Sequence, residues 1–359
     1  MRTPRPARFG IAAGMAATAL VLTAGLSAQA ATSTSWQVIA QTHYGTADLF
    51  NGLLAVAAPS GTDAWAVGGT DLSGGSPGAP VAQNWNGTSW QDSPLPSGLT
   101  GDLAAVSAPA ADDVWAVSGL AGYVLHWDGT TWSVAQQFPE SPLPGQLTGV
   151  TAFSPADVWV FGGPGANPGL GTWHLSGSTW TQVTGPGGSI TRASALSPAN
   201  IWGLGSINSP GDAIVHLSGG AWQQVTSPAL SGLTFQGILA VSAKSIWATA
   251  MLGQTPKLVH FNGTTWRRIS VPWPVQLGQP AQDGASGLWM NAQSLGSNQT
   301  WAVHRSSTGT WTRQGLPAAA SGSLIAVARI PGTTSMWGAG LLNGTTGSDA
   351  TIWGRGPAA

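Results

Sequence analysis

The chain has no cysteine and few charged residues. It therefore has no disulfide, no thiol nucleophile and no cysteine for a lipid anchor. Charged residues make up 7% of the 359 residues, with one glutamate and two tyrosines. Glycoside hydrolysis usually needs two convergent carboxylates, and the acids outside the repeat described below are scattered along the chain. No G-x-S-x-G or H-E-x-x-H motif is present. This inventory argues against an enzyme.

The first thirty residues have the composition of an export signal. Arg2, Arg5 and Arg8 precede a small and apolar stretch over residues 11–26, and residues 28–30 (AQA) fit the cleavage rule. We predict a signal peptide over residues 1–30, cleavage after Ala30 and secretion by the general export route, because no Arg-Arg pair is present. Retention of the apolar segment as a membrane anchor is the alternative.

Removal of this signal leaves nine cationic against thirteen acidic residues, a net charge of −4. A nucleic-acid partner requires a basic face, so we exclude one, and we expect no membrane span in the mature chain. The 51 glycines and 25 prolines indicate many short turns. Twenty regularly spaced tryptophans argue for a packed core rather than disorder.

Fourteen of the twenty tryptophans form two interleaved series of seven. The first series advances by 50, 44, 43, 45, 42 and 48 residues, so one supersecondary unit is written seven times. A repeat of this length with several short strands is typical of a propeller blade. The first series is Trp65, Trp115, Trp159, Trp202, Trp247, Trp289 and Trp337, and the second is Trp36, Trp90, Trp132, Trp180, Trp222, Trp266 and Trp311.

The second repeat predicts four strands, over residues 103–108, 114–117, 123–127 and 131–134. Asp128-Gly129 is expected to make the last hairpin turn, because these residue types reach positive φ most cheaply. The seventh copy holds only three strands, whereas residues 31–40 hold an isolated fourth strand around Trp36. We therefore predict an all-β, seven-bladed propeller as a single domain over residues 31–359. Its ring is closed by the N-terminal strand, and all fourteen indoles are buried in the blades.

Histidines and short acids also follow the repeat. A ring of imidazoles can indicate a metal site, but equivalent positions of separate blades cannot converge on one ion, so we expect structural histidines, no metal and no other cofactor. The residues two positions before a first-series tryptophan are expected to cap turns by bonding their own backbone. His43 lies outside the repeat, with no evident partner. The five repeat histidines are His126, His174, His216, His260 and His304, and the short polar residues are Asp63, Asp113, Asp157 and Asn200.

Residues that break the repeat are the candidate ligand-binding positions. Trp273, between two prolines, is either a stiff platform for a sugar or partner, or a lid over a blade end. Arg192 takes an inner-strand position where other blades have alanine or glycine, so we expect it to line the central channel, alone or paired with an anion or Asp283. Gln282 and Asp283 replace the apolar inner strand of the sixth blade.

The repeat resembles a large family of exported propeller proteins from actinobacteria, with the consensus D-V-W-A-V-G followed by H-W-[ND]-G-T-x-W. The likeness rests on residues 157–160 (DVWV) and 126–132 (HWDGTTW) and covers essentially the whole mature chain. That family is largely uncharacterised and has a loose similarity to kelch and galactose-oxidase propellers. The chemistry of galactose oxidase cannot carry over without its cysteine, and the arginine triad of sialidases is not identifiable. A looser likeness to tectonin and tachylectin repeats implies glycan binding.

Our leading hypothesis is a secreted, monomeric, non-catalytic propeller that binds a glycan or cell surface. The second is a scaffold for extracellular proteins. The third is a hydrolase or lyase whose axial site uses Asp283 and neighbouring loops. Fold and function remain separate questions, since one propeller architecture serves many activities.

Overall fold

The computed structural model describes residues 34–46, 49–72, 78–138, 146–163, 170–205, 213–317 and 322–356. The predicted signal peptide and its cleavage site lie outside these ranges. Within them, no helix has the length and apolarity to cross a membrane.

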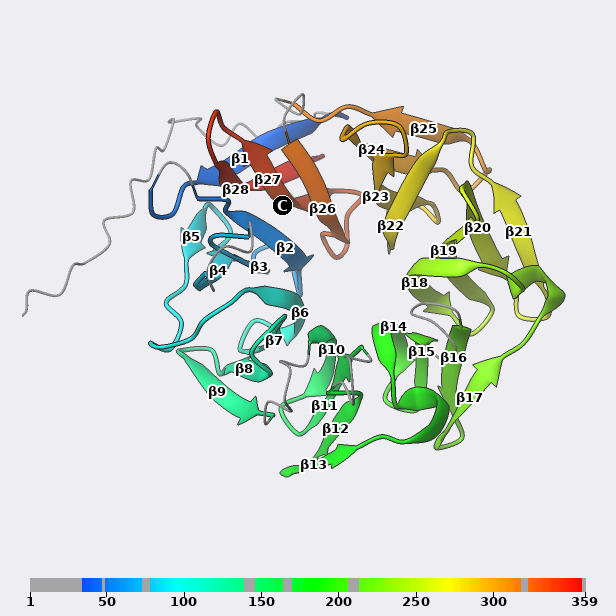
Figure 1. Cartoon of the computed structure of the whole chain (residues 1–359), viewed down its shortest axis with the longest axis horizontal. Helices are drawn as coiled ribbons and strands as arrows, with labels where there is room; N and C mark the ends of the chain where they lie inside the picture. The colour runs from blue at the N-terminus through cyan, green and yellow to red at the C-terminus, as the bar shows by residue number, and fades with distance from the viewer. Residues whose placement is uncertain are drawn as a thin grey trace, which may run out of the picture.

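The described residues form seven antiparallel sheets of four strands each, arranged in a ring (Figure 1). The innermost strand of each sheet contacts the innermost strand of the next, and the last contacts the first, so the ring is closed. This confirms the predicted seven-bladed propeller. The innermost strands are β2 (Gly52–Ala57), β6 (Leu103–Ala110), β10 (Leu147–Ser154), β14 (Ile190–Ser197), β18 (Thr234–Ser242), β22 (Val275–Gln282) and β26 (Gly322–Arg329).

The other strands follow outward in chain order. The second strands are β3 (Ala64–Gly69), β7 (Asp113–Ser118), β11 (Asp157–Gly162), β15 (Asn200–Gly205), β19 (Ser245–Leu252), β23 (Leu288–Ser294) and β27 (Met336–Asn343). The third strands are β4 (Pro80–Trp85), β8 (Tyr123–Trp127), β12 (Trp173–Ser176), β16 (Ala213–Ser218), β20 (Thr255–Phe261), β24 (Thr300–Arg305) and β28 (Ser348–Arg355). The outer strands are β5 (Trp90–Asp92), β9 (Trp132–Gln137), β13 (Thr179–Gln182), β17 (Ala221–Val225), β21 (Trp266–Ser270), β25 (Trp311–Gln314) and β1 (Trp36–Thr42).

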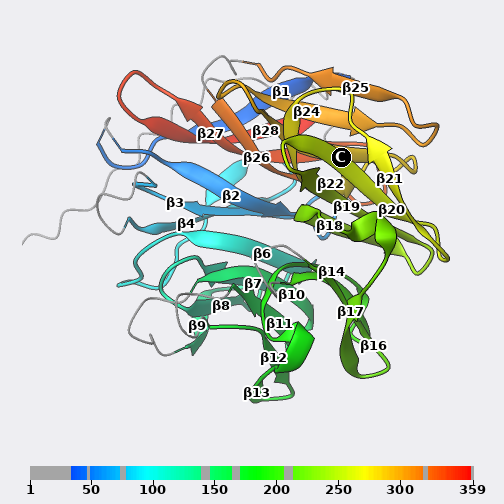
Figure 2. The same ribbon diagram turned by 45° about the vertical axis from the view of Figure 1, so that its right-hand side comes forward.

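The ring has two faces, which are visible when it is turned (Figure 2). Because neighbouring strands are antiparallel, the first hairpin of every blade and the third hairpin of blades one to six turn on one face, here called the turn face. The second hairpins and the connections between blades lie on the opposite face, here called the connection face. Two of these connections contain a short 3-10 turn, η1 (Gly185–Gly187) after β13 and η2 (Pro228–Leu230) after β17.

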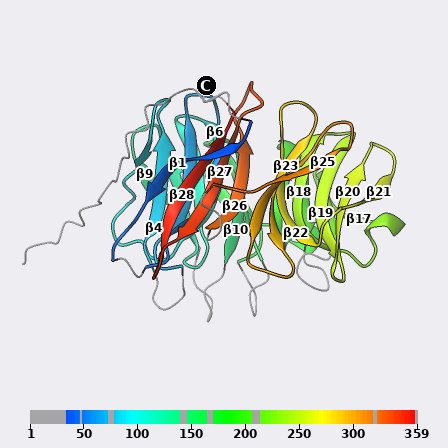
Figure 3. The same ribbon diagram turned by 90° about the horizontal axis from the view of Figure 1, so that it is seen from above.

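The N-terminal strand completes the last blade. β1 pairs antiparallel with β28, from Trp36 opposite Arg355 to Thr42 opposite Ala350, and the sheet order is β1-β28-β27-β26. Figure 3 shows the blue β1 alongside the red β28. The predicted closure is therefore confirmed, although the strand begins and ends later than the expected residues 31–40.

The two tryptophan series meet between blades. At five of the seven blade junctions a first-series indole lies edge-on against the second-series indole of the following blade, with ring centroids 5.2–6.1 Å apart. Such edge-to-face geometry aligns the positive ring edge with the negative ring face. The contacts therefore join one blade to the next, and two of them include the closing blade. The pairs are Trp65–Trp132, Trp159–Trp222, Trp202–Trp266, Trp289–Trp36 and Trp337–Trp90.

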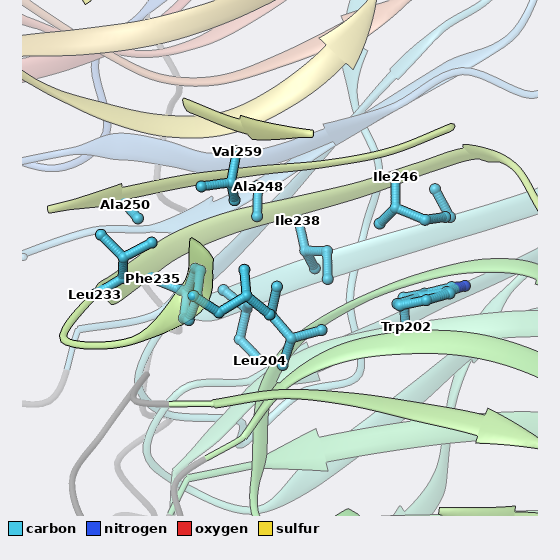
Figure 4. Close-up of a cluster of buried hydrophobic side chains, with 12 residues drawn as sticks. Trp202, Leu204, Leu233, Phe235, Ile238, Ile246, Ala248, Ala250 and Val259 are labelled. Atoms are coloured by element: carbon cyan, nitrogen blue, oxygen red, sulfur yellow. The ribbon is translucent and has the colours of Figure 1, made fainter. Parts of the chain in front are cut away.

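The apolar core also lies between blades. Seven clusters of buried side chains each combine residues of two adjacent blades. Figure 4 shows one of them, in which Trp202 and Leu204 of the fourth blade face Phe235 and Ile238 of the fifth. All first-series tryptophans are buried, but in the second series only Trp36 and Trp132 are. The expectation that all fourteen are buried was wrong, because the outer strand has no further strand to cover it.

The last hairpin turn differs from the sequence expectation in its mechanism. Gly129 has a φ of +91°, whereas Asp128 keeps a negative φ. The Asp128 carboxylate instead accepts the backbone N–H groups of Thr130 and Thr131 at 2.9 and 2.8 Å. The Asx side chain therefore substitutes for turn backbone, and glycine alone supplies the left-handed conformation. Asn86 and Asn262 accept the corresponding N–H groups in their own turns.

Ring closure by Trp36 predicts a specific loss of stability. Trp36→Ala is expected to lower the free energy of unfolding by about 3–5 kcal/mol, because it deletes a fully buried indole and leaves a cavity. Urea denaturation followed by far-UV circular dichroism measures this loss. Trp180→Ala removes a half-buried indole from the equivalent position of β13 and should cost less. An equal loss in the two variants would contradict a special role of the closing strand.

Candidate functional site

The five repeat histidines form one recurring side-chain arrangement. Each lies opposite the first-series tryptophan of its own blade, as His126 lies opposite Trp115, and the imidazole stacks on the indole. Ring centroids in the five pairs are 3.8–4.6 Å apart. Each histidine thus belongs to the framework of a separate blade, as the structural interpretation predicted.

In the second, fourth and fifth blades the short polar residue two positions before the tryptophan bonds to both the indole and the imidazole. Asp113 Oδ1 accepts Trp115 Nε1–H at 2.7 Å and His126 Nε2–H at 3.0 Å. Asn200 makes the same two contacts in the fourth blade, and Ser245 makes them in the fifth. The expected bonds to their own backbone were the wrong mechanism. Their partners are side chains across the blade, which adjacent sequence positions do not reveal.

In the sixth blade the carboxylate that contacts the histidine comes from a different position in the chain. Gly287 stands two residues before Trp289, where other blades carry Asp, Asn or Ser. A Cβ on Gly287 would meet Asp283 Oδ2 at 2.3 Å, so the Asp283 carboxylate fills the space of the missing side chain. Asp283 Oδ2 accepts His304 Nε2–H at 2.8 Å, and Oδ1 accepts the N–H groups of Ala285 and Gly287 at 2.7 Å each.

These contacts determine the ionisation of Asp283. Although burial opposes it, the hydrogen bonds from His304, Ala285 and Gly287 lower the pKa of the Asp283 carboxyl. The residue follows β22 in a turn and is not part of the inner strand, which corrects the sequence expectation. The carboxylate is buried and already satisfied, so it is a structural anchor in this arrangement.

Arg192 lies on β14, an innermost strand at the centre of the ring, and its side chain is exposed. Desolvation by the surrounding strands lowers the pKa of its guanidinium group. Arg192 does not pair with Asp283, whose carboxylate bonds to His304. Among the described residues Arg192 forms no ion pair. Its use in binding an anion stays a prediction.

Trp273 and Gln282 lie at opposite ends of the same blade. Trp273 precedes β22 on the connection face, whereas Gln282 ends β22 at the turn face beside Asp283. Trp273 is half-buried and packs on the cluster between blades five and six, with Arg313 Cζ 5.4 Å from its ring centre. This is the packing expected of a lid over a blade end. The four predicted ligand-binding residues are therefore not brought together, and their ligand contacts stay predictions.

His43 has partners that the sequence did not reveal. Its Nδ1 lies 2.6 Å from Asp349 Oδ1, and its Nε2 lies 2.8 Å from the carbonyl of Thr46. Gln41 Nε2 donates to the other Asp349 oxygen at 2.5 Å. Asp349 belongs to β28, so both contacts hold the end of β1 against the C-terminal strand. The hydrogen bond to Asp349, followed by that to Thr46, raises the pKa of His43.

Tyr44 attaches the closing strand to the first blade. Its hydroxyl donates to Asp92 Oδ1 at 2.5 Å and accepts Gln83 Nε2–H at 2.8 Å. Burial, and then the nearby charge of Asp92, raise the pKa of the Tyr44 hydroxyl. Gln83 Nε2 also lies 3.0 Å from Thr42 Oγ1, at the end of β1. Hydrogen bonds therefore connect the end of β1 to β28 of its own blade and to the first blade.

A groove of about 690 Å³ lies between blades four and five. Aromatic rings and neutral polar groups line it, and it contains no aspartate, glutamate, lysine or arginine within the described residues. Burial lowers the pKa of His216, which favours the neutral imidazole there. The aromatic lining is Trp202, His216, Phe261 and Trp266, and the polar lining is Gln223, Gln224, Thr226, Ser227, Thr264 and Thr265.

The wall of this groove is held in place by hydrogen bonds. Ser227 Oγ accepts the N–H of Ala229 and caps η2. Arg268 Nε donates to the carbonyl of Ala229 at 2.7 Å, and its Nη2 donates to the carbonyl of Ser231 at 2.5 Å. The groove extends from the Thr264–Thr265 turn on the turn face to Ser227 on the connection face.

Sequence reasoning did not find this groove. Its lining comes from two blades, and most lining residues match the residue types of the equivalent positions in other blades. The repeat pattern therefore does not single them out. The available signal was Phe261, which stands where the first two blades have Trp85 and Trp127.

No family model and no curated protein matches the chain. Solved structures do match it. YCF48 bound to D1 peptide has a TM-score of 0.61 at 15% identity, over 89% of this chain and 96% of that one. A catalytically inactive variant of virginiamycin B lyase from Staphylococcus aureus, with quinupristin, has a TM-score of 0.63 at 11% identity, over 89% and 99%. These likenesses show the fold alone.

A third match is the extracellular domain of the putative one component system BT4673 from B. thetaiotaomicron. Its TM-score is 0.58 at 11% identity, over 89% of this chain and 40% of that one. The specific actinobacterial repeat family, and the likeness to kelch and tectonin repeats, are not supported by any of these matches.

A structural role of Asp283 predicts a stability effect. Asp283→Ala is expected to lower the free energy of unfolding by about 2–3 kcal/mol, since His304 and the N–H groups of Ala285 and Gly287 lose a charged acceptor. Thermal and urea unfolding measure the change. Asp128→Ala, at an exposed turn carboxylate, is the control and should cost less. Unchanged stability in Asp283→Ala would contradict the anchoring role.

The His43–Asp349 contact predicts a pH-dependent closure. Because the pKa of His43 is raised on folding, its contribution is complete below the unfolded value of about 6.5 and disappears as pH rises through the folded value. The difference in unfolding free energy between the wild type and His43→Gln should therefore be larger at acidic than at alkaline pH. Urea titrations over this range provide the measurement. Asp349→Asn should remove the dependence, and a difference that grows with pH would refute it.

Proposed function

We propose that the protein is an exported, non-catalytic propeller that binds a glycan in the groove between blades four and five. The observation that carries the proposal is the groove lining, which combines aromatic rings, amides and hydroxyls and includes no charged side chain among the described residues. Indole and phenyl faces stack on the apolar faces of sugar rings, and amides and hydroxyls bond to ring hydroxyls.

The dimensions of the groove support the same proposal. A volume of about 690 Å³ lies within the range of small-ligand sites, about 300–1,000 Å³. An adjoining hollow of about 190 Å³ shares Gln224 and Ser227 and continues over η2 towards Phe235. Such an extended site suits a chain of sugars better than a single ring. The hydrogen bonds of Arg268 keep its wall preorganised, which reduces the ordering cost of binding.

Export by residues 1–30 and a location outside the cell belong to the proposal. Nucleic acid is not among the proposed partners, and a monomer of residues 31–359 is the proposed form. A carboxylate pair is not required, because binding alone needs no proton transfer.

A scaffold for extracellular proteins is the second candidate. YCF48 is described as bound to a peptide, so one protein of similar architecture binds a peptide. The same groove offers amide groups to a peptide backbone. A hydrolase or lyase with an axial site is less supported, since Asp283 is occupied by His304 and lies apart from Arg192 and Trp273.

Binding to a panel of immobilised neutral polysaccharides tests the glycan proposal. Gln223→Ala should weaken binding by about threefold to tenfold, the effect of one neutral hydrogen bond. Gln91 lies at the equivalent outer-strand position of the first blade, opposite Asn84, as Gln223 lies opposite His216. Gln91→Ala is therefore a matched control and should leave binding unchanged.

Two results would overturn this proposal. One is the absence of binding to every neutral polysaccharide of the panel. The other is an equal effect of Gln223→Ala and Gln91→Ala. Capture of an extracellular protein through the groove, lost in Gln223→Ala, would favour the scaffold instead.

A further inference from the structure

Charge is divided unequally between the two halves of the ring. Residues 31–191 contain ten acidic residues and no lysine or arginine. Residues 192–359 contain all nine cationic residues outside the leader and three acidic ones. The first three blades are therefore acidic, and the last four together carry the positive charge. The small net charge of the mature chain conceals this division.

The basic half places arginines between blades. The third-strand residue opposite the outer tryptophan is Trp85, Trp127, Leu175, Leu217 and Phe261 in blades one to five. In blades six and seven it is Arg305 and Arg355. Arg355 lies near Asp283, whose charge favours the protonated guanidinium. Arg305 has no such partner.

Arg305 lies among aromatic and cationic groups. Its Cζ is 5.2 Å from the ring centre of Trp247 and 5.9 Å from that of Trp311. Burial, and then repulsion from Arg267, lower the pKa of its guanidinium group. Its Nε is buried and has no hydrogen-bond partner within the described part of the chain. Arg267 lies opposite His260, which stacks on Trp247, and Arg305 lies over the same indole, so both guanidinium groups lie on one side of blade five.

In the fifth blade the residue that contacts the repeat histidine is a serine, so the repeat supplies no acid to this cluster. His126, His174 and His304 each contact an aspartate, whereas the equivalent His260 contacts the hydroxyl of Ser245 at 3.2 Å. Burial, followed by the charges of Arg267 and Arg305, lowers the pKa of His260 to about 4. The imidazole is therefore neutral near pH 7. Among the described residues, no carboxylate forms an ion pair with Arg267 or Arg305.

The cationic cluster adjoins the proposed glycan groove. Trp266 lines the groove, and Arg267 follows it on β21. Because successive side chains of a strand point to opposite sides, Arg267 faces the neighbouring space between blades five and six. Both residues begin β21 at the turn face, as the strand register shows. One ligand chain crossing the outer strand of blade five reaches both places.

We propose that Arg267 and Arg305 bind an oxyanion substituent of an acidic polysaccharide whose uncharged rings occupy the groove. The proposal rests on the glycan function above and adds the ligand class. Guanidinium groups bind carboxylate, sulfate and phosphate by paired N–H donors. The flanking indoles hold Arg305 in place, and an incoming anion relieves the repulsion between the two arginines.

Dextran and dextran sulfate share a backbone and differ in charge, so they separate the two proposals. We expect Arg267→Ala and Arg305→Phe each to weaken dextran sulfate binding by about tenfold and to leave dextran binding unchanged. Phenylalanine is the residue of blade five at this position, so Arg305→Phe retains the packing. Lys257→Ala is the control, because Lys257 lies on β20 towards the connection face of the same blade. It should change affinity by less than twofold.

The outcomes distinguish the two proposals. Equal wild-type affinity for both polymers, unaffected by either arginine variant, overturns the anion site and leaves the groove proposal intact. Binding of dextran sulfate alone, lost in Arg267→Ala, supports the anion site and overturns the neutral groove. Salt-sensitive dimerisation in sedimentation, abolished by Arg267→Ala without any effect on polymer binding, assigns the cluster to the acidic half of a second copy and overturns the polysaccharide proposal.

Discussion

The packing of apolar side chains between successive blades is the constraint on which the ring depends, and edge-to-face tryptophan contacts reinforce it at five of the seven junctions. A single four-stranded sheet of this size has two faces to cover and no helix to cover them. Each blade buries its apolar side chains only against its neighbours, as the seven clusters between blades show. With no disulfide, and with no lysine or arginine ion pair among the described residues, the indole contacts provide directional specificity between blades.

The sequence was sufficient for the architecture but not for the binding surface. The spacing of the tryptophans shows the repeat directly. Trp36 indicated the closing strand because the isolated segment around it resembles the outer strands of other blades. Asp283 was misplaced because its carboxylate replaces a side chain that Gly287 lacks, and only the folded turn brings those two positions together. The partner of His43 was hidden for a similar reason, since Asp349 is distant in sequence.

The groove and the cationic cluster show how one framework carries different chemistry. Both lie between blades, beside a histidine stacked on a tryptophan, and differ at the third-strand position that Phe261 and Arg305 occupy. The framework residues keep their positions while this one residue changes from an aromatic ring to a cation. Variation between equivalent sites therefore identifies candidate ligand contacts better than the abundance of tryptophan does.

Strand β1 carries a consequence for the order in which the molecule assembles. Trp36 and Arg355 are paired neighbours, yet they stand at opposite ends of the described chain. Because synthesis begins at the N-terminal end, β1 is made first and has no partner until β28 has followed. Until then the edge of the last sheet is unpaired and open to strands of other molecules. Long-range contacts of this kind slow folding, and completion of the ring is necessarily the final step.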